Sequence, residues 1–113
     1  MEKLAGSLTS VYTGVMTNDY ERLSQSDVFN LPQNAASGTS RAMLSNRLSW
    51  FFDLAGPSLT LDTACSSSLY ALHLACQSIR LGESHQVLFL RTVRLKNDGL
   101  TRDFNRLSLQ VLT

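Results

Sequence analysis

Residues 57 to 82 read as a short strand, a tight turn and a helix, and this unit limits what the rest of the chain can build around it. The strand is Pro57 to Leu61, entered through a Gly-Pro turn. The helix ends at Gly82, a residue that readily adopts the left-handed conformation of a helix cap. Its apolar positions recur at helical spacing: Leu69, Leu72, Cys76 and Ile79. A lone thiol, Cys65, therefore falls at or just before the first helical turn.

A cysteine at the start of a helix is well placed to act as a nucleophile. Unpaired backbone N–H groups and the positive end of the helix dipole stabilise an anion there, and thiolate is the reactive form of cysteine. The competing interpretation is that Cys65 is a small buried hydrophobe, which is the usual role of a single cysteine in an apolar sequence. Spacing alone favours this second interpretation, so the surrounding residues have to decide between the two.

The rest of the chain alternates between extended and helical patterns. We predict a strand near residues 9 to 16, a short helix from Asn18 through Leu23, a loop over 24 to 38, a helix over 39 to 52 and a strand over 86 to 93. Such alternation predicts α/β layers. In the helix over 39 to 52, one apolar stripe is expected to face the core: Met43, Leu44, Leu48 and Phe51. The aromatic run Trp50 to Phe52 is expected to be core as well.

Composition excludes several classes of protein. The chain has 113 residues, 43% hydrophobic and 17% charged, which suits one globular domain or part of one and argues against disorder. A net charge of +1 gives no electrostatic case for nucleic acid or a membrane surface. No apolar run approaches the roughly 20 residues that span a bilayer, and the N-terminus lacks a signal-peptide core. Cys65 and Cys76 lie too far apart along a helix to form a disulfide, which predicts a reducing, cytoplasmic compartment.

Three blocks of sequence, in a fixed order, favour the interpretation of Cys65 as a nucleophile. Residues 10 to 20 and residues 36 to 52 precede the third block, which contains Asp62-Thr63-Ala64-Cys65-Ser66-Ser67-Ser68-Leu69 and continues to Arg80. Together they resemble the β-ketoacyl synthase (ketosynthase) domains of fungal, highly reducing type I polyketide synthases. The resemblance runs from about Lys3 to about Leu90 and implies that Cys65 is the catalytic nucleophile. It assigns no residue of this chain to a cofactor or a metal.

The resemblance implies a partial thiolase-like α/β fold, a portion of its N-terminal half with an incomplete sheet. It implies decarboxylative condensation of acyl and malonyl thioesters through an acyl-cysteine, with the backbone N–H of Cys65 contributing to an oxyanion hole. No cofactor is bound; in the family, substrates arrive as thioesters on the phosphopantetheine of acyl carrier proteins. The resemblance also implies that two protomers pair through the strand that precedes the cysteine, here Leu59 to Thr63. Trp50, Phe51 and Phe52 could then line an acyl channel, although core packing is preferred.

Two departures from the family pattern change what this chain can be expected to do. The family also uses two histidines and a lysine from later segments, and neither His73 nor His85 matches them. We expect His73 to pack or hydrogen-bond on its helix and His85 to lie exposed in a polar turn. From Arg91 the sequence no longer aligns, which divides the chain into a partial synthase domain, 1–90, and a divergent tail, 91–113. The sheet is then expected to have open edges and the chain to self-associate.

Three interpretations stay open on the sequence. The chain is a ketosynthase fragment that keeps its nucleophile but does not turn over alone; or a noncatalytic module that docks with a full ketosynthase through Leu59 to Thr63; or the nonfunctional product of a truncated or wrongly predicted gene.

Overall fold

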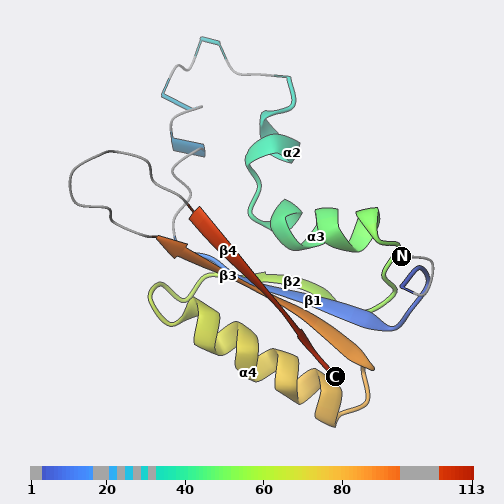
Figure 1. The fold of residues 1–113 in the computed structure, drawn as a ribbon. Coiled ribbons are helices and arrows are strands. Elements are labelled where there is room, and N and C mark those ends of the chain that lie inside the picture. The colour runs from blue at the N-terminus through green and yellow to red at the C-terminus, as the bar shows by residue number, and fades with distance from the viewer. Residues whose placement is uncertain (1–3, 17–20, 23–24, 27–28, 31–32, 95–104) are drawn as a thin grey trace.

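A four-stranded sheet with helices on both faces forms the body of the protein in a computed structural model (Figure 1). The structure describes residues 4–16, 21–22, 25–26, 29–30, 33–94 and 105–113. The order across the sheet is β2-β1-β3-β4. The strands are β1 (Thr9–Gly14), β2 (Ser58–Leu61), β3 (Gln86–Arg94) and β4 (Asn105–Leu112). β1 pairs in parallel with β2 and β3, and β4 runs antiparallel to β3.

The first strand lies at the centre of the parallel part of the sheet. All six residues of β1 are buried, and Val11 faces Ser58 of β2 on one side and Leu88 of β3 on the other. A strand buried on both faces is typical of a parallel sheet covered by helices on each side. The predicted strand near residues 9 to 16 and the strand predicted over 86 to 93 are both confirmed.

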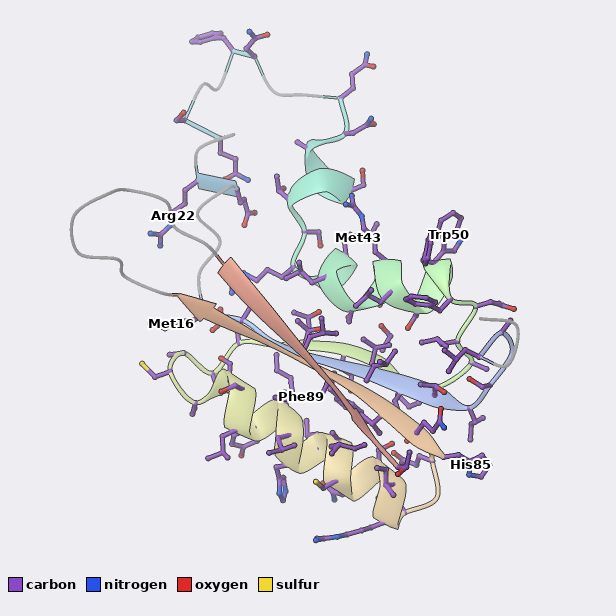
Figure 2. The ribbon with its side chains drawn as sticks, viewed as in Figure 1. Met16, Arg22, Met43, Trp50, His85 and Phe89 are labelled. Carbon is purple, nitrogen blue, oxygen red and sulfur yellow. The ribbon has the colours of Figure 1, made fainter. Side chains whose placement is uncertain are left out.

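Helix α4 (Ser67–Arg80) covers one face of the sheet. Ala71 and Ala75, one turn apart, are fully buried against Tyr12, Val87 and Phe89. Small side chains at this contact let the helix axis approach the strands closely, and Figure 2 places Phe89 between the sheet and α4. The helix ends as predicted, because Gly82 has a φ of 73° and donates its N–H to the carbonyl of Ile79 at 3.1 Å.

Helix α3 (Ala42–Phe51) covers the opposite face, but not with the predicted apolar stripe. Leu44 is 48% exposed and Phe51 70% exposed, and Met43 and Leu48 are only half-buried. The buried residue is Ser45, whose hydroxyl lies 2.9 Å from Oγ1 of Thr60 on β2. The short hydroxyl side chain of Ser45 fits closely against β2, where Thr60 supplies a second hydroxyl. The predicted stripe was wrong because it considered apolar residues alone and so passed over Ser45.

The aromatic run at the end of α3 was also expected in the core, and that expectation is wrong for two of its three members. Trp50 is 85% exposed, and Figure 2 shows it on the side of α3 away from the sheet. Phe52 is half-buried and packs edge-on against Phe51, with ring centroids 5.0 Å apart. The predicted loop over 24–38 is interrupted at its end by a short helix, α2 (Ala35–Thr39). The helix predicted from Asn18 to Leu23 lies mostly outside the described residues.

The C-terminal segment adds a strand that the sequence did not predict. β4 pairs with β3 from Val87↔Leu112 to Arg94↔Asn105. β4 thus gives β3 a second neighbour, and Val87 and Phe89 are buried. β3 itself continues past residue 90, so the boundary between the domain 1–90 and the tail 91–113 stays a prediction. In the part of the chain that is described, β2 has a single neighbour and its Leu59 is 43% exposed.

Candidate active site

Cys65 lies in the turn that joins β2 to α4, at the carboxyl edge of the parallel strands. β2 ends at Leu61 and α4 begins at Ser67, so the predicted strand-turn-helix junction is confirmed. The Cys65 side chain is exposed, which excludes the interpretation that it is a buried hydrophobe. In α/β sheets, binding and reactive groups gather at the carboxyl ends of the strands. The Cys65 thiol is therefore exposed to solvent at the carboxyl ends of the parallel strands, where active sites of α/β proteins are commonly found.

The residue before the cysteine has an unusual backbone conformation. Ala64 has a φ of 56°, a left-handed conformation that costs a residue with a Cβ atom about 1–2 kcal/mol. The surrounding turn holds it there. The N–H of Ala64 donates to Oδ1 of Asp62 at 3.1 Å, and its carbonyl accepts from the hydroxyl of Ser67 at 2.7 Å. Strain that is maintained by several contacts beside a reactive side chain is a pattern found at functional sites.

The serines that follow Cys65 hold the turn in place. Oγ of Ser67 also accepts the N–H of Thr63 at 2.7 Å, so one hydroxyl connects both sides of the turn. Ser66 donates its hydroxyl to the carbonyl of Thr63 at 2.8 Å and lies 2.9 Å from Oγ1 of the same residue. These hydroxyls pair with backbone groups of the turn before α4, and no side-chain hydrogen bond caps the helix itself. The Ser66-Ser67 pair thus fixes the path of the chain on either side of the thiol.

A glycine on the central strand brings the sheet against this turn. A Cβ atom on Gly14 would lie 2.8 Å from the carbonyl carbon and oxygen of Ser67 and from the nitrogen of Ser68. Only a residue without a side chain allows β1 and the first turn of α4 to come so close. Sequence reasoning missed this role, although a glycine within a strand pattern is a known signal of close backbone approach.

An ion pair links the turn to the other face of the sheet. Oδ2 of Asp62 contacts Nη1 of Arg41, the residue immediately before α3. The Arg41 side chain is 44% exposed and the Asp62 side chain 28% exposed, so the pair is partly shielded from water. Asp62 therefore uses one carboxylate oxygen for the turn and the other for α3. The sequence analysis did not find this contact, because the two residues lie 21 positions apart.

The two histidines do not join Cys65. His73 is exposed on α4, edge-on to Tyr70 with ring centroids 6.4 Å apart. It lines an open hollow of about 550 Å³ on the outer side of the helix, together with Leu69, Tyr70, Leu72, Cys76 and Arg80. His85 lies exposed in the turn between α4 and β3 (Figure 2), and its backbone N–H donates to the carbonyl of Leu8. It therefore lies at the amino ends of the parallel strands, whereas Cys65 follows the carboxyl end of β2.

The described ranges contain no cluster of three or more histidine, cysteine or acidic side chains that could hold a metal ion. No helix among them is long and apolar enough to cross a membrane. Cys65 and Cys76 are both free thiols. Cys76, half-buried on α4, lies eleven residues after Cys65 and provides a natural internal reference for its reactivity.

Residues 1–90 match the family described as the β-ketoacyl synthase N-terminal domain. The highly reducing polyketide synthase alnA of Emericella nidulans is 71% identical over 86 residues, which are 76% of this chain and 4% of that protein. The polyketide synthase component of the lovastatin nonaketide synthase of Aspergillus terreus is 51% identical over 88 residues, 78% of this chain and 3% of its own length. The chain thus spans only a few per cent of the curated relatives that it matches.

The fold is also similar to solved structures. The ketosynthase from module 6 of the bacillaene synthase of Bacillus subtilis 168 superposes with a TM-score of 0.68 and 30% identity, over 86% of this chain and 15% of that one. The oxazolomycin ketosynthase domain OzmH KS7 of Streptomyces albus JA3453 gives a TM-score of 0.61 and 38% identity, over 80% of this chain and 15% of its own length. The predicted α/β, partial thiolase-like fold is therefore confirmed.

Proposed function

Because this chain belongs to the β-ketoacyl synthase family and covers an N-terminal portion of a polyketide synthase ketosynthase domain, we propose that its Cys65 is the residue that accepts the growing acyl chain. The observation that carries the proposal is the exposed thiol of Cys65, which follows the left-handed Ala64 at the carboxyl edge of the sheet.

The chemistry assigned to Cys65 is a thioester exchange. The thiolate sulfur attacks the carbonyl carbon of an acyl thioester, a new carbon–sulfur bond forms, and the carbon–sulfur bond to the carrier breaks. The carrier thiolate leaves and takes up the proton that Cys65 gave up. The exchange is nearly balanced in energy because one thioester replaces another, and the backbone N–H of Cys65 contributes a hydrogen bond to the tetrahedral oxyanion.

The second half of ketosynthase chemistry is not assigned to the described residues. Condensation requires a carbanion, formed by loss of carbon dioxide from a malonyl thioester, and groups that stabilise the negative charge as it develops. His73 and His85 lie away from Cys65 and do not supply them. We therefore assign to this chain the loading of the acyl group, and expect the 113 residues by themselves not to complete the condensation.

The partners follow from this chemistry. We propose that the acyl group arrives as a thioester on the phosphopantetheine of a carrier protein, that no further cofactor takes part, and that the reaction occurs in the reducing cytoplasm, where Cys65 stays a thiol. We also propose that two copies pair in the ketosynthase manner along β2. Within the described part of the chain β2 pairs with β1 on one side alone, and its Leu59 is 43% exposed, which supports this pairing.

Acylation of the whole 113-residue chain tests the proposal. The protein is incubated with an acyl N-acetylcysteamine thioester, and intact mass followed by peptide mapping locates the product. We expect one acyl group on Cys65, lost in Cys65→Ala and kept in Cys76→Ala. Acylation of Cys76 in the folded chain, or no acylation of a chain shown by circular dichroism to be folded, would contradict the proposal.

The open edge of β2 also favours a second candidate, a noncatalytic module that binds a complete ketosynthase. That function needs β2 but does not need the thiol. A pull-down with a full-length ketosynthase separates the two, because binding that survives Cys65→Ala, combined with absent acylation, favours the docking module.

A further inference from the structure

We propose that Arg41 is a positioning residue for Cys65. Acting through Asp62, it fixes the left-handed turn at Ala64 and so makes the reactivity of the thiol depend on the placement of α3. The inference rests on the proposed function only in taking Cys65 as the reacting group. Arg41 touches no substrate in this proposal.

The first step is the way Asp62 divides its contacts. Its Oδ1 accepts the N–H of Ala64 at 3.1 Å, which is a local contact within the turn. Its Oδ2 is held by Nη1 of Arg41 from a different element. A short side chain with both oxygens engaged has little freedom to rotate. By holding the other oxygen, Arg41 restricts the carboxylate and thereby adds to the contacts that keep Ala64 in place.

The second step is the anchoring of α3, which makes Arg41 a fixed point. Ser45 Oγ lies 2.9 Å from Thr60 Oγ1, and Ser58 donates its hydroxyl to Asn46 Oδ1 at 2.8 Å. Both contacts join α3 to β2, the strand that leads into the cysteine turn. These two hydrogen bonds hold α3 against β2. The Arg41–Asp62 ion pair adds a third contact, between the residue before α3 and the cysteine turn.

The third step is the strain at Ala64. An alanine at a φ of 56° relaxes toward an ordinary right-handed or extended conformation when nothing prevents it. Such relaxation would change the direction in which the chain leaves the turn, and with it the placement of the exposed Cys65 thiol and its access to an electrophile. The pair is partly exposed, so its effect on the alkylation rate is expected to be a few-fold.

The experiment measures iodoacetamide alkylation of both thiols in the full chain at pH 7.5, with Cys76 as the internal reference for folding. Arg41→Ala is expected to slow Cys65 about threefold to fivefold and to leave Cys76 unchanged. Arg41→Lys, which keeps a cation, is expected to restore most of the rate. Arg47→Ala is the matched control, because Arg47 lies within α3 and, among the described residues, donates to the carbonyl of Ser37 at 3.4 Å and makes no ion pair with the cysteine turn. It is expected to change neither thiol.

A double variant separates positioning from simple charge neutralisation. Arg41→Ala with Asp62→Asn removes both charges together. If Arg41 acts by position, Cys65 in the double variant stays as slow as in Arg41→Ala. Recovery of the wild-type rate would mean that the arginine only cancels an anion, and it would overturn the proposal, as would an unchanged rate in Arg41→Ala. If Arg41→Ala also speeds alkylation of Cys76 through loss of folding, Arg41→Gln is judged by the same criteria.

Measuring the acylation of Cys65 in the same variants tests the positioning role of Arg41 separately from the proposed acyl-accepting role of Cys65. Slower alkylation in Arg41→Ala, with no acylation of the wild-type chain, supports the positioning role and contradicts the acyl-accepting role. Normal acylation and normal alkylation in Arg41→Ala contradict the positioning role and leave the acyl-accepting role supported.

Discussion

Replacing Gly14 with alanine should destabilise the protein by about 1–2 kcal/mol. The new Cβ would lie 2.8 Å from backbone atoms of Ser67 and Ser68, well inside the roughly 3.5–4.0 Å of an ordinary carbon contact. Backbone atoms cannot rotate away, so β1 and α4 must move apart. Overpacking costs about 1–3 kcal/mol, and close contact with three backbone atoms places this change in the upper part of that range, about 2–3 kcal/mol. About 1 kcal/mol is recovered because alanine restricts the unfolded chain more than glycine does.

The melting temperature converts this cost into an observable shift. An unfolding entropy of about 2.1 cal/mol/K per residue corresponds to a shift of about 4 °C per kcal/mol for a chain of 113 residues. We therefore expect Gly14→Ala to melt about 4–8 °C below the wild type by circular dichroism. Gly38→Ala is the matched control, because a Cβ there has no atom within 4 Å, and its melting temperature is expected to stay level or rise. A Gly14→Ala protein as stable as the wild type would refute the close packing of β1 on α4.

Three further changes test other parts of the structure. Val87→Ala removes a fully buried side chain and is expected to cost about 2 kcal/mol in urea unfolding; a cost below about 0.5 kcal/mol would place Val87 outside the core. Ser67→Ala removes two hydrogen bonds of the cysteine turn and is expected to cost about 1–2 kcal/mol by the same assay, with an unchanged midpoint arguing against that bridge. Leu59→Lys places a charge on the exposed edge of β2 and is expected to lower the apparent mass in light scattering, while Leu81→Lys, at the end of α4, should not; association unaffected by either change would exclude β2 as the contact.

The sequence predicted those features that depend on neighbours along the chain. The junction around Cys65 was found because strand and helix periodicities meet there, and the end of α4 because Gly82 follows the last apolar position. β1 was found from the alternation of Val11, Thr13 and Val15 with their neighbours, and β3 from an apolar run that follows a polar turn. These are local patterns, and the structure agrees with them to within a few residues.

The features that the sequence did not predict depend on contacts between distant segments. Ser45 is buried because Thr60 supplies a hydroxyl partner from another element, and Arg41 finds Asp62 only once α3 lies on the sheet. β4 is a different case, since the alternating Leu107, Leu109 and Val111 carried a strand signal that the loss of family resemblance obscured.

The order of strands in the sheet has a consequence for the chain as it is synthesised. β1 is made first and is buried throughout, yet its pairing partners appear much later: Val11 pairs with Ser58, and Thr9 with Gln86, 77 positions on. At about 5–20 residues per second, a ribosome needs several seconds to deliver the second neighbour. During that interval the strand that ends up buried at all six positions has no partner on one or both sides. Contacts across such long loops also form slowly. The parallel core of the sheet therefore cannot close during translation until β3 has been made, and until then the backbone of β1 is free to pair with other extended segments.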